Sequence, residues 1–131
     1  EGLAAVIGGD DETGTWGFID KTGTYVINPQ FHDARSFSEG LAAVRIGDGM
    51  TGTWGFIDKT GSFVINPQFD GARSFSDGLA AVRIGDYETG KWGFIDKTGS
   101  VVINPQFDLA APFSEGLAAV SISGRYGFIA R

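Results

Sequence analysis

Short apolar runs alternate with turn-forming residues along the whole chain. Residues 16–20, Trp-Gly-Phe-Ile-Asp, are aromatic and β-branched, which is typical of a strand. Residues 20–23, Asp-Lys-Thr-Gly, predict a tight turn, because Asp bonds to nearby backbone N–H groups and Gly supplies a positive φ. A return strand follows at 25–27, and we expect Asn28-Pro29 to end it, because Pro donates no ladder hydrogen bond. The pattern predicts an antiparallel hairpin with a glycine bulge at its turn.

A third strand is predicted at residues 41–46, Leu-Ala-Ala-Val-Arg-Ile. The preceding segment, 31–40, is less regular: Ala34 and Phe37 are expected as buried anchors, and residues 38–40 as a turn. The paired alanines recur in every copy of the third strand. Small side chains at fixed places indicate that another layer approaches closely there.

The pattern repeats every 38 residues, and residues 16–53 and 54–91 are identical at 30 of 38 positions. Such a period is the signature of a repeat architecture. We expect a single tandem-repeat domain over residues 1–131. Its parts are a partial unit at 1–15, repeats at 16–53, 54–91 and 92–125, and a partial unit at 126–131.

One unit contains the runs Gly-Phe-Ile-Asp-Lys-Thr-Gly, Asn-Pro-Gln-Phe and Glu-Gly-Leu-Ala-Ala-Val. In these runs, and in its Trp-Gly pair, the chain resembles the bacterial WG repeat family over nearly its whole length. The last copy departs from the motif, since Tyr126 replaces Trp. The resemblance implies a β-rich repeat protein of the bacterial cell envelope or extracellular space, without a general catalytic role.

The predicted fold is all-β: antiparallel meander or hairpin repeats, three strands per unit, stacked into a solenoid-like array. A three-stranded ribbon cannot bury its apolar face alone, so neighbouring units must cover it. We expect phenylalanine ladders at Phe18, Phe56, Phe94 and Phe128, and at Phe31, Phe69 and Phe107. A ring-closed, propeller- or barrel-like arrangement is the alternative.

The two ends of the chain supply single strands, at residues 3–7 and 126–129. They could meet and close a ring, cap an open array, or pair with neighbouring chains, since open strand edges are templates for pairing. The candidate assembly residues are Leu3, Val6, Tyr126, Phe128 and Ile129.

Composition narrows the function classes. Glycine contributes 21 of 131 residues, which disfavours long helices. The net charge of −6 argues against a nucleic-acid partner, and the absence of cysteine removes disulfides and thiol chemistry. Apolar runs all fall short of the roughly 20 residues of a membrane span.

Catalytic constellations are not found in the sequence. His32, the single histidine, occupies the position held by Asp70 and Asp108 in the sister units, and we interpret it as drift. The recurring Asp20, Asp58 and Asp96 are explained by turn formation. We expect no enzymatic activity and no cofactor.

Acidic loops suggest calcium only weakly. Asp10, Asp11, Glu12, Asp86 and Glu88 offer oxygen ligands, but without the spacing of a known calcium loop. We interpret them as solvated loops and expect no metal site. The arginines Arg35, Arg45, Arg73 and Arg83 recur in two units only, and are interpreted as surface charges paired with acids.

The periodic aromatic row gives the best functional argument. Its members are Trp16, Trp54, Trp92 and Tyr126, each followed by Gly. Such a row could stack sugar rings or hold a cationic head group. Packing between repeats is the preferred interpretation, with the glycine giving the indole room. We expect a non-enzymatic structural module: a rigid spacer or a self-associating, filament-forming surface protein. Its partners would be copies of itself or other proteins. The alternative is a module that binds carbohydrate or cell wall.

Overall fold

The computed structural model describes residues 1–8, 14–49 and 51–131, and within them it contains strands and no helix. The strands are β1 (Ala4–Gly8), β2 (Thr15–Ile19), β3 (Tyr25–Phe31), β4 (Asp33–Ala34), β5 (Ala42–Ile46), β6 (Thr53–Ile57), β7 (Phe63–Phe69), β8 (Gly71–Ala72), β9 (Ala80–Ile84), β10 (Lys91–Ile95), β11 (Val101–Phe107), β12 (Leu109–Ala110), β13 (Leu117–Ile122) and β14 (Arg125–Ala130). They form two compact units, Glu1–Gln68 and Phe69–Arg131.

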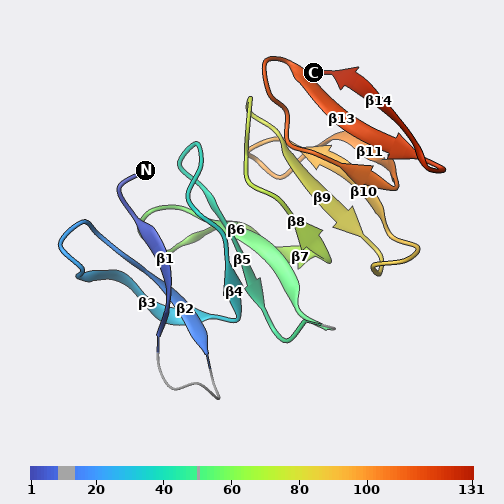
Figure 1. Ribbon diagram of the computed structural model, residues 1–131. Coiled ribbons are helices and arrows are strands. Elements are labelled where there is room, and N and C mark those ends of the chain that lie inside the picture. The colour runs from blue at the N-terminus through green and yellow to red at the C-terminus, as the bar shows by residue number, and fades with distance from the viewer. Residues whose placement is uncertain (9–13, 50) are drawn as a thin grey trace. The chain divides into compact units, whose positions relative to one another are not determined.

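Each unit contains two sheets, and the pairings assigned in them are antiparallel (Figure 1). The first unit has the sheets β1-β2-β3 and β4-β5-β6-β7. The second has β8-β9-β10-β11 and β12-β13-β14. The all-β, antiparallel and repetitive character expected from the sequence is therefore confirmed, and the described strands form no closed barrel.

The sheets do not coincide with the sequence repeats. A complete sheet joins the third strand of one repeat to the Trp strand and return strand of the next, as in β5-β6-β7. A short strand that pairs with the third strand completes it, as β4 does with β5. The expected three-stranded ribbon per repeat is wrong in this respect: the strands of one repeat belong to two sheets, because the loop between repeats also connects antiparallel neighbours.

The hairpin turns have the predicted geometry. The Asp20 N–H donates to the Thr24 carbonyl at 2.9 Å, the Gly23 N–H donates to the Asp20 carbonyl at 3.0 Å, and Gly23 has a φ of 86°. The turns at Asp58 and Asp96 repeat this arrangement. These bonds fix the register of each hairpin close to its turn.

The return strands are longer than predicted, because Asn28-Pro29 lies inside β3 and not at its end. Pairing runs from Trp16↔Phe31 to Phe18↔Ile27, so three residues of β3 face one residue of β2. This bulge removes Pro29 from the regular ladder, where its missing N–H would otherwise cost a hydrogen bond. β11 has the same register shift opposite β10.

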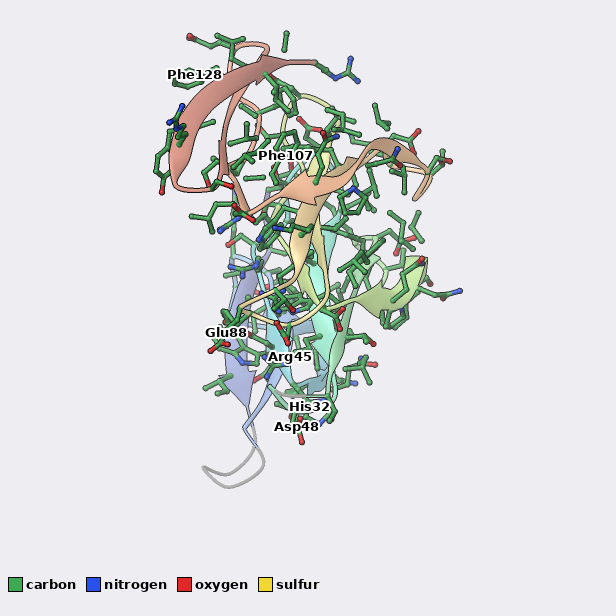
Figure 2. All side chains as sticks on the ribbon, turned by 90° about the vertical axis from the view of Figure 1, so that its right-hand side faces the viewer. His32, Arg45, Asp48, Glu88, Phe107 and Phe128 are labelled. Carbon is green, nitrogen blue, oxygen red and sulfur yellow. The ribbon has the colours of Figure 1, made fainter. Side chains whose placement is uncertain are left out.

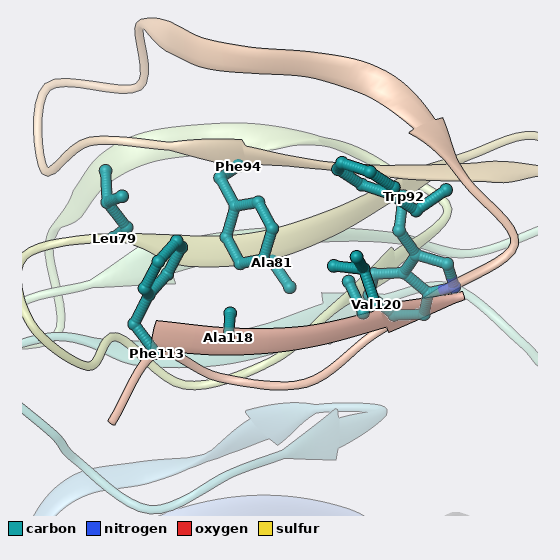
Figure 3. Close-up of a cluster of buried hydrophobic side chains, with 9 residues drawn as sticks. Leu79, Ala81, Trp92, Phe94, Phe113, Ala118 and Val120 are labelled. Carbon is teal, nitrogen blue, oxygen red and sulfur yellow. The ribbon is translucent and has the colours of Figure 1, made fainter. Parts of the chain in front are cut away.

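Within each unit the two sheets bury a common apolar core. In the second unit, Trp92 and Phe94 of β10 pack with Phe113, Ala118 and Val120 (Figure 3). In the first unit, the core contains Phe18, Ile27, Phe31, Phe37, Ala42, Val44 and Ile57. Each large apolar side chain buried in this way contributes about 1.5–3 kcal/mol.

The phenylalanines of the expected ladders are buried at all positions but one, whereas their stacking between units stays a prediction. Phe18, Phe56 and Phe94 are fully buried, as are the paired alanines of β5 and β9, and the ladder at Phe31, Phe69 and Phe107 is also buried. The expectation that Phe128 is buried is wrong, because its side chain is 74% exposed. Among the described residues, β14 has no return strand beside it, and no further phenylalanine covers the ring of Phe128.

Candidate functional site

The aromatic row divides into buried and exposed members. The indoles of Trp54 and Trp92 are 6% and 7% exposed, Trp16 is half-buried, and Tyr126 is 73% exposed. The two fully packed indoles therefore present little surface to a ligand. Tyr126 presents most of its ring.

Arginines cover the two buried indoles. The Arg45 and Arg35 guanidinium carbons lie 6.0 and 5.0 Å from the Trp54 ring centroid. Arg83 and Arg73 repeat this over Trp92, at 5.8 and 4.9 Å. Cation–π contact favours this placement. One arginine of each pair also stands directly opposite its Trp across the strands, as Arg45↔Trp54 and Arg83↔Trp92 show.

The sequence contained a signal for this role of the arginines: they occur opposite the two buried indoles and not opposite the other two rings of the row. Tyr126 pairs with Ser121, and Trp16 pairs with Ile7, so arginine is absent from both positions beside the less buried rings. The interpretation as acid-paired surface charge describes Arg45 only in part, since its Nη1 lies 3.8 Å from Asp33. The arginines are better understood as part of the indole packing.

The glycine after each Trp faces the Asn-Pro bulge of the return strand. A Cβ on Gly93 would lie 2.5 Å from the Ile103 carbonyl oxygen and 2.6 Å from the Pro105 nitrogen. Gly17 and Gly55 are equally crowded by backbone. The expectation that this glycine makes room for the indole is therefore wrong, because it makes room for the neighbouring backbone. Gly127, in the last copy, has no atom within 4 Å of such a Cβ.

The repeated aspartates act in the turns. Asp96 accepts from the Thr98 hydroxyl at 2.6 Å and from the Thr98 and Ser100 N–H groups at 2.9 and 3.1 Å. The hydroxyl bond is the main reason why the pKa of Asp96 lies below its usual value, and the backbone bonds add to it. The pKa values of Asp20 and Asp58 are lowered by the equivalent threonines. This supports the structural interpretation of these carboxylates.

A second set of acids connects successive repeats. The Glu1 carboxylate accepts from the Glu39 and Gly40 N–H groups at 2.6 and 2.9 Å, 38 and 39 residues further along. Asp77 accepts from the Gly116 N–H at 2.9 Å in the same manner. The sequence indicated a turn here, but not that an acid from the preceding repeat holds it.

His32 performs the task of the aspartates at its position. Its Nδ1 accepts from the Gly47 N–H at 2.9 Å, and Asp70 Oδ2 accepts from the Gly85 N–H at 2.7 Å. The Ser123 N–H donates to Asp108 Oδ2 at 2.7 Å in the last copy. The interpretation of His32 as drift from the aspartate of the sister units is compatible with this bond, because the imidazole accepts where the carboxylates accept.

The loop acids are engaged locally. Asp86 accepts from the Thr89 and Glu88 N–H groups at 2.7 and 3.0 Å, and the Thr89 bond is the first cause of its lowered pKa. Asp10, Asp11 and Glu12 lie outside the described residues. Within residues 1–8, 14–49 and 51–131, no group of three or more His, Asp or Glu side chains is placed to hold a metal ion.

The candidate assembly residues lie at two sheet edges. Leu3 and Val6 are half-buried at β1, and Leu3 packs against the core of its unit. On β14, Tyr126 is exposed and Ile129 is half-buried. Phe128 of the same strand is exposed (Figure 2). These β14 residues, with Phe107, Val120 and Ile122, line a groove of about 520 Å³. The β14 edge is therefore the candidate functional site.

These features define a class: an all-β tandem-repeat protein in which each repeat completes the sheet of its neighbour. Comparison with family models matches the WG containing repeat at residues 16–49, 54–87 and 92–126, and the chain belongs to that family. Comparisons with curated proteins and with solved structures found no match. Among the described residues, no helix is long and apolar enough to cross a membrane.

Proposed function

We propose that the chain is a non-enzymatic structural and assembly module of the bacterial cell surface or extracellular space. It acts as a rigid spacer that self-associates, and its units continue into an open, solenoid-like array. The resemblance to the family is the support for this location, and the repeats are the support for the module character.

The burial of Trp54 and Trp92 beneath paired arginines is the observation that carries this proposal. The tryptophan that starts each of these two repeats is therefore a packing residue. An indole that stacks sugar rings needs an accessible face, and these two have almost none. The binding of carbohydrate or cell wall by the Trp row is accordingly the second choice.

Exposed apolar residues on an unpaired strand edge support self-association. Tyr126 and Phe128 present most of their rings beside the groove of β14.

Mass measured against concentration tests the proposal. Sedimentation and electron microscopy should show oligomers or filaments that grow with concentration. Phe128→Lys should reduce them, because it places a charge at the edge, while Tyr87→Lys, at an exposed loop side chain, is the matched control. A monomer at every concentration, with no filaments, would reject self-association. A glycan panel should leave Trp fluorescence unchanged, and a saturable change would favour the second choice.

A further inference from the structure

The turn after β5 is held by the side chain of the residue between β3 and β4. This residue is His32, the single histidine of the chain, and its Nδ1 accepts from the Gly47 N–H at 2.9 Å. A neutral imidazole has one nitrogen that accepts a hydrogen bond and one that carries a proton. Because Nδ1 is the acceptor, the proton of the neutral ring belongs on Nε2, and the contact exists only while His32 is uncharged.

Gly47 is held through both of its backbone polar groups. Its N–H donates to His32, and its carbonyl oxygen accepts from the Arg45 Nε at 3.1 Å. The same Arg45 guanidinium lies over the Trp54 ring, 6.0 Å from the centroid. A change of charge on His32 therefore acts, through one glycine, on the turn that also holds the arginine above the indole.

The next repeat has the same turn with a different acceptor. Gly85 has a φ of 104°, against 101° at Gly47, and its carbonyl oxygen accepts from the Arg83 Nε at 3.0 Å. Its N–H donates to the Asp70 carboxylate at 2.7 Å. The two turns thus share their backbone conformation and their arginine contact, and an imidazole in one replaces a carboxylate in the other. A carboxylate ordinarily stays ionised down to about pH 4, whereas an imidazole gains its proton between about pH 8 and pH 5.

Charged groups on β4, on β5 and in the turn lie around His32, at one end of the first unit (Figure 2). Asp33 pairs with Arg45 across the strands, and its Oδ2 lies 3.8 Å from the Arg45 Nη1. Asp48 follows Gly47, and its Oδ1 accepts from the Thr51 N–H at 2.8 Å. The two carboxylates attract a charged imidazole and Arg45 repels it, so the decisive effect of a proton is the loss of the acceptor at Nδ1.

Protonation of His32 sets two donors against each other. The charged ring donates from both nitrogens, so its Nδ1–H and the Gly47 N–H, whose nitrogens are 2.9 Å apart, repel each other. Because the His32 side chain is exposed, the ring can turn towards water, and the Gly47 N–H then loses its acceptor. The bond from Arg45 to the Gly47 carbonyl oxygen is left to hold the start of the turn without this second contact.

We propose that His32 is an acid-sensitive anchor, which holds the turn at Gly47 at neutral pH and releases it as the pH falls towards about 5. The carboxylates at the equivalent positions remain acceptors over this range, so Gly85 and Ser123 stay bound to Asp70 and Asp108. One repeat thereby has a response to pH that the next two lack. The proposal goes beyond the assembly function, and self-association can fail without affecting it.

Amide signals of the full chain, followed by NMR between about pH 7.5 and pH 5, test the anchor. The Gly47 amide shift should follow the titration of the His32 ring signals. Its protection against hydrogen exchange, corrected for the intrinsic effect of pH, should fall about threefold to tenfold, because one hydrogen bond contributes about that much. Protection at Gly85 should change by less than about twofold. A Gly47 signal that does not follow the ring, or an equal loss at Gly85, would overturn the proposal.

Two reciprocal substitutions are the matched controls. His32→Asp introduces the acceptor of the next repeat, so protection at Gly47 should stay constant within about twofold over the same pH range. Asp70→His should transfer the response, with protection at Gly85 falling about threefold to tenfold in acid. If one variant does not fold, the other still decides. A response at Gly47 that persists in His32→Asp, or none at Gly85 in Asp70→His, would refute the role of the imidazole.

Discussion

Gly93→Ala is the sharpest test of the packing between the Trp strand and the return strand. The added Cβ would lie 2.5 Å from the Ile103 carbonyl oxygen and 2.6 Å from the Pro105 nitrogen, both of them backbone atoms. Protein Cβ atoms essentially never approach closer than 3.0 Å, so the bulge must move by about half an ångström or more. Overpacking of this kind costs about 1–3 kcal/mol, and the upper end applies because backbone cannot rotate away.

Gly127→Ala is the matched control, since it makes the same change at the same repeat position without a neighbour within 4 Å. Its backbone has no positive φ, so we expect stability equal to that of the unaltered chain, or higher by about 0.5–1 kcal/mol, because alanine loses less entropy than glycine in a strand. Urea unfolding followed by far-ultraviolet dichroism measures both variants. Equal midpoints for Gly93→Ala and the unaltered chain would refute the account of the bulge.

Further substitutions test the remaining contacts by urea unfolding. Trp92→Ala should destabilise by about 3–5 kcal/mol, and Tyr126→Ala by less than about 0.5, because the first ring is buried and the second exposed. Equal losses would contradict the division of the aromatic row. Asp77→Ala should cost about 0.5–1.5 kcal/mol by removing the acceptor between repeats, and Asp77→Glu serves as its control. If Asp77→Ala and Asp77→Glu lowered the free energy of unfolding equally, the hydrogen bond to Gly116 would not be the cause. Thr98→Val should raise the pKa of Asp96 towards 3.8, because it removes the donating hydroxyl. Since the lowered pKa stabilises the fold above about pH 3.8 and this contribution disappears as the pH falls through the native value, the variant should be less stable at pH 7 and match the unaltered chain at about pH 2. A difference that persists at low pH would contradict this assignment.

Local chemistry explains which parts of the fold could be predicted. The hairpin at 20–23 is determined by a side chain and a glycine within four residues, so the sequence alone identifies it. The buried phenylalanines follow from their recurrence at one repeat position. The position of Pro29 could not be deduced in this way, because its place inside a strand depends on a glycine across the ladder.

The site was harder to predict than the fold, because its key relations join different repeats. Arg83 and Trp92 belong to successive repeats, and only the pairing of β9 with β10 places them opposite each other. The acid contact between Asp77 and Gly116 likewise spans 39 residues. A sequence read one repeat at a time assigns each of these residues to the surface or to a turn.

The last copy differs from the others in a coordinated manner. Tyr126 stands in place of Trp, and Ser121 and Ala111 stand in place of the two arginines that cover it in other copies. Gly127 does not change with them. In the described structure no atom lies within 4 Å of the place that a Cβ would take there, and glycine costs about 0.5–1 kcal/mol relative to alanine in a strand. The positions that lie over the ring have changed, while the position that faces a return strand is the same as in β10.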